Sequence, residues 1–187
     1  MTRVGLFAPV FLIAAVSAAS SPAVAQTLKP TPSGRGTTAV TLVGPDKPFT
    51  ISIDFGQPHA RGRVVTGALP ADLDTVWRLG ANDPTTLRSD VDLVIGSITV
   101  PKGAYTLSAR TSASGAWKLI VNRKTGPEAV PYDAMADLGR TPLTSRTLAT
   151  PIESFTMWLI PASDGSPAGE LRFAWGTREF SAPWKVK

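Results

Sequence analysis

Proline and glycine are spread so densely along this chain that they decide what it can fold into. The 187 residues include 17 prolines and 16 glycines. Proline lacks the amide hydrogen that a helix interior needs, and glycine loses much backbone freedom there. Both residues are common in the tight turns that join short strands. The sequence therefore predicts β structure rather than long helices.

The apolar residues between these breaks follow the two-residue period of strands. Within residues 49–55, Phe49, Ile51, Ile53 and Phe55 share one face and polar residues share the other. A short helical turn is expected within residues 71–78, where acidic residues suit a helix start. Further strands are predicted at residues 85–89, 91–95, 98–100, 104–110, 117–122, 143–149, 154–160, 170–176 and about 180–186, and residues 126–139 are expected to form a long excursion over the sheet.

Antiparallel strands without intervening helices must cover their apolar faces with another sheet. The predicted fold is therefore all-β: an antiparallel β-sandwich or jelly-roll-like barrel with a flexible N-terminal segment and at most one or two short helices. We expect this single domain to span residues 49–187. Residues 26–48 are expected to be a flexible tether, because residues 26–38 are polar and rich in proline and glycine.

Residues 1–25 have the features of a secretory signal peptide. Residues 1–3 are positively charged, residues 4–16 are largely apolar, and Ala23-Val24-Ala25 has the small-x-small pattern of a cleavage site. Cleavage is expected after Ala25, with Ala18 and Ala19 as alternatives. The apolar run is shorter than the roughly 20 residues that span a bilayer, so no transmembrane segment is expected after cleavage. We therefore expect export by the general secretory route to the periplasm or the medium.

Composition removes several classes of site. The chain has no cysteine, which excludes disulfides and thiolate metal ligands. The formal charge of +5 comes from scattered Lys and Arg residues rather than a dense stripe, so nucleic acid is not an expected partner. His59 is the single histidine, and one imidazole cannot build a metal site with two or three histidine ligands. No metal and no cofactor are expected, and the oligomeric state is left open.

Two polar loops carry the candidate binding residues. The first follows the strand at residues 49–55, and the second precedes the strand at residues 85–89. Polar side chains held on loops by a rigid β scaffold commonly form binding sites, and guanidinium groups suit carboxylate or phosphate recognition. A structural alternative is that Asn82 and Asp83 cap turns through their side chains, Gly80 supplies a positive φ, and Arg78 pairs with Asp83. The candidate residues are His59, Arg61, Arg63, Arg78, Asn82, Asp83 and Thr85.

The same region resembles a bacterial family catalogued as domain of unknown function 2911. The family pattern has a Tyr-Ser-Arg-Pro strand end, a Lys-Gly-Arg loop, a Leu-Val-Pro segment, Val-Trp-Arg-x-Gly-Ala-Asn-Glu-x-Thr, and Ala-Gly-Thr-Tyr before a Trp-bearing strand. Phe55, Gln57 and Asp83 depart from it, which puts any role of the family's Tyr, Arg or Glu in doubt. The matching segments are residues 55–58, 61–63, 68–70, 76–85 and 102–105, with Trp117. The resemblance spans residues 49–186 and implies the fold and export but no activity.

Three functions stay open at this stage. The favoured hypothesis is non-catalytic binding of a small polar or anionic ligand, or of a cell-envelope partner, in a pocket whose neighbouring rims are the two loops. The second is a hydrolase of envelope or extracellular substrates with Asp83 or His59 as acid or base, although no local catalytic motif is present. The third is a purely structural or interaction module. Trp158, Trp175 and Trp184 form either an aromatic platform for a ligand or packing between sheets.

Overall fold

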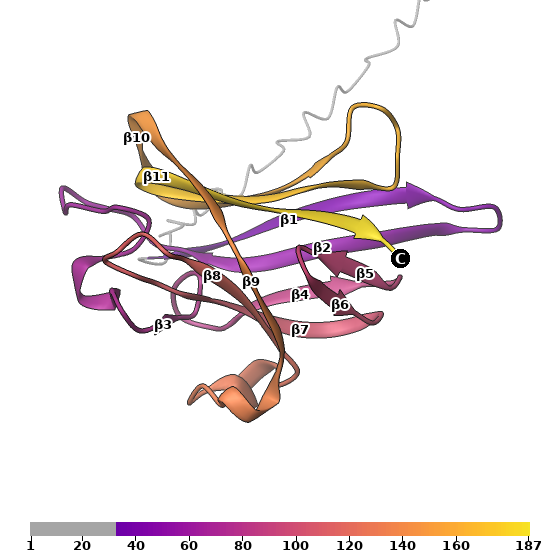
Figure 1. Cartoon of the computed structure of the whole chain (residues 1–187), viewed down its shortest axis with the longest axis horizontal. Helices are drawn as coiled ribbons and strands as arrows, with labels where there is room; N and C mark the ends of the chain where they lie inside the picture. Colours follow the sequence, from indigo (N-terminus) through magenta and orange to yellow (C-terminus); the bar gives the residue numbers. More distant parts are fainter. Residues whose placement is uncertain (1–32) are drawn as a thin grey trace, which may run out of the picture.

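The computed structural model describes residues 33–187, and these residues form two antiparallel sheets packed face to face (Figure 1). The prediction of an all-β sandwich is confirmed. The predicted signal peptide lies outside the described residues. Among residues 33–187, no helix is long and apolar enough to cross a membrane.

The first sheet has seven strands in the order β1-β2-β4-β7-β8-β9, with β3 also paired to β7. Strands β2 and β4 alternate in burial, and in β2 the predicted inward residues Ile51, Ile53 and Phe55 are at most 3% exposed, whereas the central strands β7 and β8 are buried on both faces. The bounds are β1 Gly34–Val43, β2 Pro48–Gln57, β3 Val76–Trp77, β4 Thr85–Ser89, β7 Gly103–Arg110, β8 Lys118–Asn122 and β9 Asp137–Pro142.

The second sheet has four strands in the order β10-β11-β5-β6. The sequence predicted two strands in place of β10 and two in place of β11, because register shifts between Thr147 and Thr156 interrupt the alternation of β10. The bounds are β5 Leu93–Ile95, β6 Ile98–Val100, β10 Thr144–Pro161 and β11 Ala168–Val186, and the short 3-10 helices are η1 Pro70–Asp72, η2 Gly126–Ala129 and η3 Ala134–Ala136.

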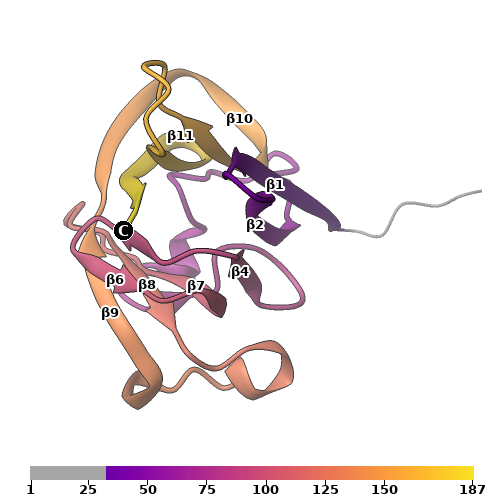
Figure 2. The same ribbon diagram turned by 90° about the vertical axis from the view of Figure 1, so that its right-hand side faces the viewer.

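The two sheets approach each other along both edges, which gives the sandwich a barrel-like outline (Figure 2). On one side, the amide of Leu159 in β10 donates to the hydroxyl of Thr38 in β1 at 3.1 Å. On the other, the amide of Ser97 between β5 and β6 donates to the hydroxyl of Thr141 in β9 at 3.2 Å. The enclosed space is filled by side chains of both sheets.

Strand β1 corrects the predicted N-terminal tether. Residues 34–43 pair with β2 along the full length of both strands, so the prediction that residues 26–48 are flexible is wrong for this part. The strand was missed because Gly, Thr and Arg dominate its first half, and only Val40 becomes buried. It is nevertheless stabilised by the ladder to β2 and by the contact with β10.

Aromatic rings fill the core at the end of the sandwich where the two polar loops lie. Phe155 contacts Phe55 and Trp77 edge to face, with ring centroids 5.7 and 5.2 Å apart. Trp77 stacks on Trp175 at 5.9 Å. Trp175 and Trp184 are each 2% exposed and Trp158 is half-buried. Trp175 and Trp184 therefore pack in the core, whereas Trp158 lies on the opposite face of β10 from the buried Met157 and Leu159.

Candidate functional site

The loop from Pro58 to Ala68, which carries three candidate residues, is fixed to the second sheet where β10 and β11 are irregular. The amide of Ala60 donates to the carbonyl of Glu153 at 2.8 Å, and the amide of Thr177 donates to the carbonyl of Val65 at 3.1 Å. Gly176 has φ +63°, and a Cβ there would lie 1.9 Å from the Val65 oxygen, so only glycine fits. The loop is therefore held in one position on β10 and β11 by backbone hydrogen bonds and close packing.

The second loop, from Arg78 to Pro84, is held just as closely. The buried hydroxyl of Thr85 donates to the carbonyl of Leu79 at 2.5 Å. Leu79 and Asn82 have positive φ angles of 51° and 62°, and Gly80 has φ +149°. The positive φ expected for Gly80 is observed, whereas the side chain of Asn82 donates to the carbonyl of Ser33 instead of capping the turn. Such left-handed conformations persist only where surrounding contacts impose them.

Two clefts flank the second loop. The tryptophan cleft, about 460 Å³ in volume, is lined by Ser33, Pro58, Arg63, Leu69, Asp72, Trp77, Arg78, Gly80, Ala81, Asn82 and Trp175. The aspartate cleft, about 650 Å³, is lined by Arg35, Asp54, Arg78, Asn82, Asp83, Pro84, Thr86, Gly126, Pro127 and Val130. Arg78 and Asn82 thus form a ridge between the two clefts.

The tryptophan cleft brings together residues from both predicted loops. Arg63 reaches it with two of its donors already used, since Nε and Nη2 donate to the carbonyls of Ala60 and His59 at 2.8 and 2.6 Å. Arg78 donates through Nη1 to the carbonyl of Asn82 at 2.7 Å. The side chain of Asn82 donates to the carbonyl of Ser33 at 3.1 Å. Both guanidinium groups are thereby held in place by backbone oxygens.

The structural alternative for this loop included an ion pair between Arg78 and Asp83. That ion pair is not found among residues 33–187, and the guanidinium of Arg78 donates to the carbonyl of Asn82 instead. Asp83 lies in the aspartate cleft, where its carbonyl accepts from Nη1 of Arg35 at 3.3 Å. Arg35 also forms an ion pair with Asp54. Arg35 was not among the predicted site residues because β1 was not recognised as a strand, and Asp54 was not because no spacing in the sequence pairs its carboxylate with another.

Three predicted residues lie outside both clefts. Thr85 is 0% exposed and its hydroxyl binds Leu79, so it supports the loop from the interior. Arg61 is exposed, and its amide donates to the Glu153 carboxylate at 2.7 Å. His59 is half-buried, with Nδ1 2.7 Å from the hydroxyl of Ser154 in the adjacent β10. The structure therefore brings together Arg63, Arg78 and Asn82, but not these three residues.

The contact between His59 and Ser154 resembles a base–nucleophile pair only in its distance. The two residues face each other in an isolated β-bridge, so backbone pairing is sufficient to place them together. A catalytic dyad needs a third group that orients the imidazole. Within residues 33–187, the imidazole of His59 has no second hydrogen-bond partner that could orient it. In that same part of the chain, no group of three His, Cys, Asp or Glu residues is placed to hold a metal ion.

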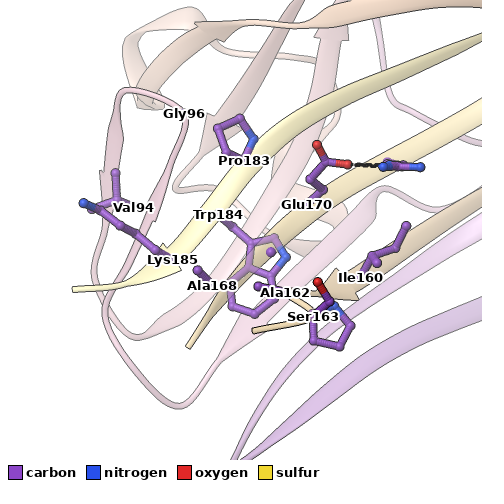
Figure 3. A pocket seen from close by; sticks show the side chains of 13 residues that line it. Val94, Gly96, Ile160, Ala162, Ser163, Ala168, Glu170, Pro183, Trp184 and Lys185 are labelled. Carbon is purple, nitrogen blue, oxygen red and sulfur yellow. Dashed lines mark hydrogen bonds and ion pairs between the residues drawn. The ribbon is translucent and has the colours of Figure 1, made fainter. Parts of the chain in front are cut away.

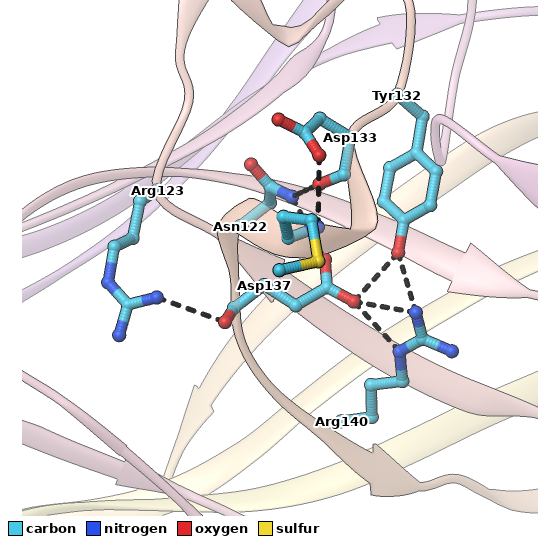
Figure 4. Close-up of polar contacts among 7 residues, drawn as sticks. Asn122, Arg123, Tyr132, Asp133, Asp137 and Arg140 are labelled. Atoms are coloured by element: carbon cyan, nitrogen blue, oxygen red, sulfur yellow. Dashed lines mark hydrogen bonds and ion pairs between the residues drawn. The ribbon is translucent and has the colours of Figure 1, made fainter.

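A further polar cluster, unpredicted from the sequence, fixes the excursion before β9 (Figure 4). Asp137 accepts from Tyr132, Arg140 and Asn122 at 2.7, 2.8 and 2.9 Å. Asn122 also donates to the carbonyl of Asp133 at 2.8 Å. Burial and the neighbouring Asp137 carboxylate raise the pKa of Tyr132 to about 12. Since these groups satisfy one another, the cluster is a structural clamp.

The fold and the clefts define the chain as an antiparallel β-sandwich protein with two clefts beside the loop from Arg78 to Pro84. It belongs to the DUF2911 family of proteins of unknown function, whose model matches residues 39–184. The resemblance inferred from the sequence is thus confirmed, and the match includes both polar loops. Comparison with curated proteins and with solved structures finds no match.

Proposed function

We propose that the domain binds a small anionic ligand in the tryptophan cleft without catalysing a reaction on it. The observation that carries the proposal is that Arg63 and Arg78, from two separate loops, line one cleft together with Asn82. Two guanidinium groups facing one space favour a carboxylate or phosphate ligand because they offer charged, directional donors.

The donors that remain on these groups support this assignment. Nη1 of Arg63 and both Nε and Nη2 of Arg78 have no hydrogen-bond partner within residues 33–187. Asp72 is the acidic residue that lines the same cleft, so the cationic side chains outnumber the anionic one. An anion placed between the two guanidinium groups would satisfy the remaining donors and balance the charge.

The walls of the cleft favour a small ligand. Trp77 and Trp175 are 7% and 2% exposed, so only their edges reach the cleft and no open ring face is offered for stacking. The indole N–H of Trp175 donates to the carbonyl of Glu153 at 3.2 Å and is not free for a ligand. Recognition therefore rests on the guanidinium groups and on nearby polar atoms. A cell-envelope component with an exposed phosphate or carboxylate is a partner of the same chemistry.

The test is calorimetric titration with inorganic phosphate, sulfate and succinate. Arg63→Ala and Arg78→Ala should each weaken binding about 10- to 100-fold, the effect of losing one charge-assisted hydrogen bond. Arg78→Lys should restore only part of the affinity, because an ammonium lacks the planar fork. Arg88→Ala is the matched control, since Arg88 is exposed on β4 and lies outside both clefts. Equal affinity of a folded Arg78→Ala protein and the wild type would contradict the proposal.

A hydrolase is the second candidate, because Asp54 and Asp83 line the same aspartate cleft and carboxylate pairs catalyse glycoside hydrolysis. In this candidate, Asp54, which Arg35 holds in an ion pair, serves as the base or nucleophile, and Asp83 serves as the acid. A screen with glycoside, ester and peptide substrates tests this candidate. Turnover that is equal in the wild type and in Asp83→Asn would remove it.

We also propose that the chain is exported and cleaved after Ala25. The support is the sequence pattern of residues 1–25 alone. Expression of the full chain in a bacterial host, followed by mass measurement of the protein from the periplasm and medium, tests the proposal. A product that begins at Gln26 is expected, whereas an intact Met1 on protein retained in the cytoplasm would contradict export.

A further inference from the structure

A pocket on the second sheet is separate from the tryptophan and aspartate clefts and shares no lining residue with either. This hairpin pocket, about 630 Å³ in volume, lies between the β10–β11 turn, the end of β11 and strand β5 (Figure 3). Strand β11 curls until the amide of Val186 donates to the carbonyl of Pro167 at 2.8 Å, which brings its two ends together. The volume is in the range of pockets that bury small organic molecules. The lining is mainly apolar and includes Val94, Ile160, Pro161, Ala168, Pro183 and Trp184.

One polar atom in this apolar lining has no partner. Trp184 is 2% exposed, and its indole Nε1 is buried without a hydrogen bond to any residue in the described part of the chain. By contrast, the indoles of Trp117 and Trp175 donate to the carbonyls of Ser112 and Glu153. A buried donor without an acceptor is costly, and such groups are rare in native proteins. The unpaired N–H therefore needs an explanation.

The indole is also prevented from turning away to find another acceptor. Gly169 lies against it so closely that a Cβ there would be 2.9 Å from Cε2 of Trp184 and 1.9 Å from the carbonyl oxygen of Ile160. In Figure 3 the indole nitrogen faces the side of the pocket where Ile160 and Ser163 lie, while Val94 and Lys185 lie on the other side. The backbone of the hairpin thus fixes the direction in which the N–H points.

The charged residues in the wall do not call for a charged ligand. Arg172 donates through Nε to the Glu170 carboxylate at 2.6 Å, so these two charges largely neutralise each other. Lys185 is exposed and extends away from the indole nitrogen. A ligand that suits this pocket is therefore mainly apolar and carries one oxygen that can accept the hydrogen bond from Nε1 of Trp184.

We infer that the hairpin pocket binds a small, uncharged, mainly apolar molecule whose carbonyl oxygen accepts a hydrogen bond from Nε1 of Trp184. Because Nε1 is covered by neighbouring atoms, a small movement of the pocket wall accompanies binding of the ligand. The site is separate from the tryptophan cleft and shares no lining residue with it.

Acetophenone and ethylbenzene are suitable probes, because they have nearly the same shape and only acetophenone carries the oxygen acceptor. Titration of the ¹⁵N-labelled protein should shift one indole N–H resonance, the one missing in Trp184→Phe, and only acetophenone should shift it strongly downfield. Acetophenone should bind about tenfold more tightly than ethylbenzene, as one neutral hydrogen bond allows. In Trp184→Phe that preference should fall to about one.

Two further variants separate binding in this pocket from other effects. Ala168→Phe fills the pocket and should abolish binding of both probes, while Arg78→Ala, in the other site, should leave both affinities unchanged. The inference is overturned by equal affinity of the wild type for acetophenone and ethylbenzene, or by the absence of a resonance shift with either probe up to its solubility limit. Unchanged binding in a folded Ala168→Phe protein would place the probes elsewhere and also overturn it.

Discussion

Single residues decide whether the loop that carries Arg78 can sit where it does. The backbone of Gly56 in β2 lies directly beneath this loop, and a Cβ on Gly56 would be 1.8 Å from the carbonyl oxygen of Ala81. The loop also depends on the buried hydroxyl of Thr85, which binds the carbonyl of Leu79. The position of the Arg78 guanidinium is therefore set by two small residues that never touch a ligand.

Gly56→Ala should lower the free energy of unfolding by about 1–3 kcal/mol or more, because the added methyl group meets backbone that can move only if the whole loop moves. Gly34→Ala is the matched control: no atom lies within 4 Å of a Cβ at that position, so its stability should change by less than about 1 kcal/mol. Urea denaturation of both variants measures the difference. If Gly56→Ala were as stable as Gly34→Ala, the close packing of the loop on β2 would be refuted.

At the scale of elements, an ion pair joins β10 and β11 near the end of their hairpin that lies farthest from the connecting turn. Glu179 is 8% exposed and accepts from Nε and Nη2 of Arg146 at 2.6 and 2.9 Å. These hydrogen bonds hold the pKa of Glu179 below its ordinary value of 4.5, against the opposing effect of burial. The contact ties Ser145-Arg146-Thr147 to β11 just before the register shifts begin.

Glu179→Gln should lower the melting temperature at pH 7 by roughly 2–4 °C, the response of a domain of this size to one modest interaction. A carboxylate with a lowered folded-state pKa contributes stability that is fully present above the unfolded-state pKa and is lost as the pH falls through the folded-state pKa. The difference between wild type and variant should therefore shrink below pH 4.5. Glu128→Gln, on the exposed η2, is the control and should match the wild type at each pH. A difference that stays constant from pH 7 to pH 3 would rule out this linkage.

The accuracy of the sequence predictions also varied with the element. Strands β2, β4 and β6 were placed well, because tight turns and strict alternation mark their ends within the local sequence. β10 and β11 were each divided, because bulges and Gly176 interrupt an alternation that hydrogen bonding carries through. Arg78 and Asn82 were predicted as binding residues from their motif, and both line the tryptophan cleft. A pocket between the two loops was expected from the sequence, but the part of its wall formed by Trp175 was not predictable, because this side chain reaches the cleft through long-range packing that no local pattern encodes.

For the molecule as a whole, β1 is the element that closes one side of the sandwich. It pairs with β2 along its full length, and its Thr38 hydroxyl accepts from the amide of Leu159 in the opposite sheet. Arg35, on the same strand, reaches Asp54 and the carbonyl of Asp83. Residues 34–43 therefore connect both sheets to the aspartate cleft, although the sequence alone predicts a tether there.

Removal of β1 should therefore destabilise the whole sandwich and not only the edge of the first sheet. A chain that begins at Ser33 should unfold cooperatively, with a melting temperature within a few degrees of a chain that begins at Gln26. A chain that begins at Gly44 exposes the ladder edge of β2 and the apolar faces of Ile51 and Ile53, so it should aggregate or lose its cooperative transition.

Thr38→Val is the finer variant: it keeps the side-chain volume but removes the acceptor for Leu159, at a cost of about 1–3 kcal/mol for the unpaired amide. Calorimetry and size-exclusion chromatography measure these outcomes, and a stable, monomeric chain beginning at Gly44 would show that β1 is dispensable.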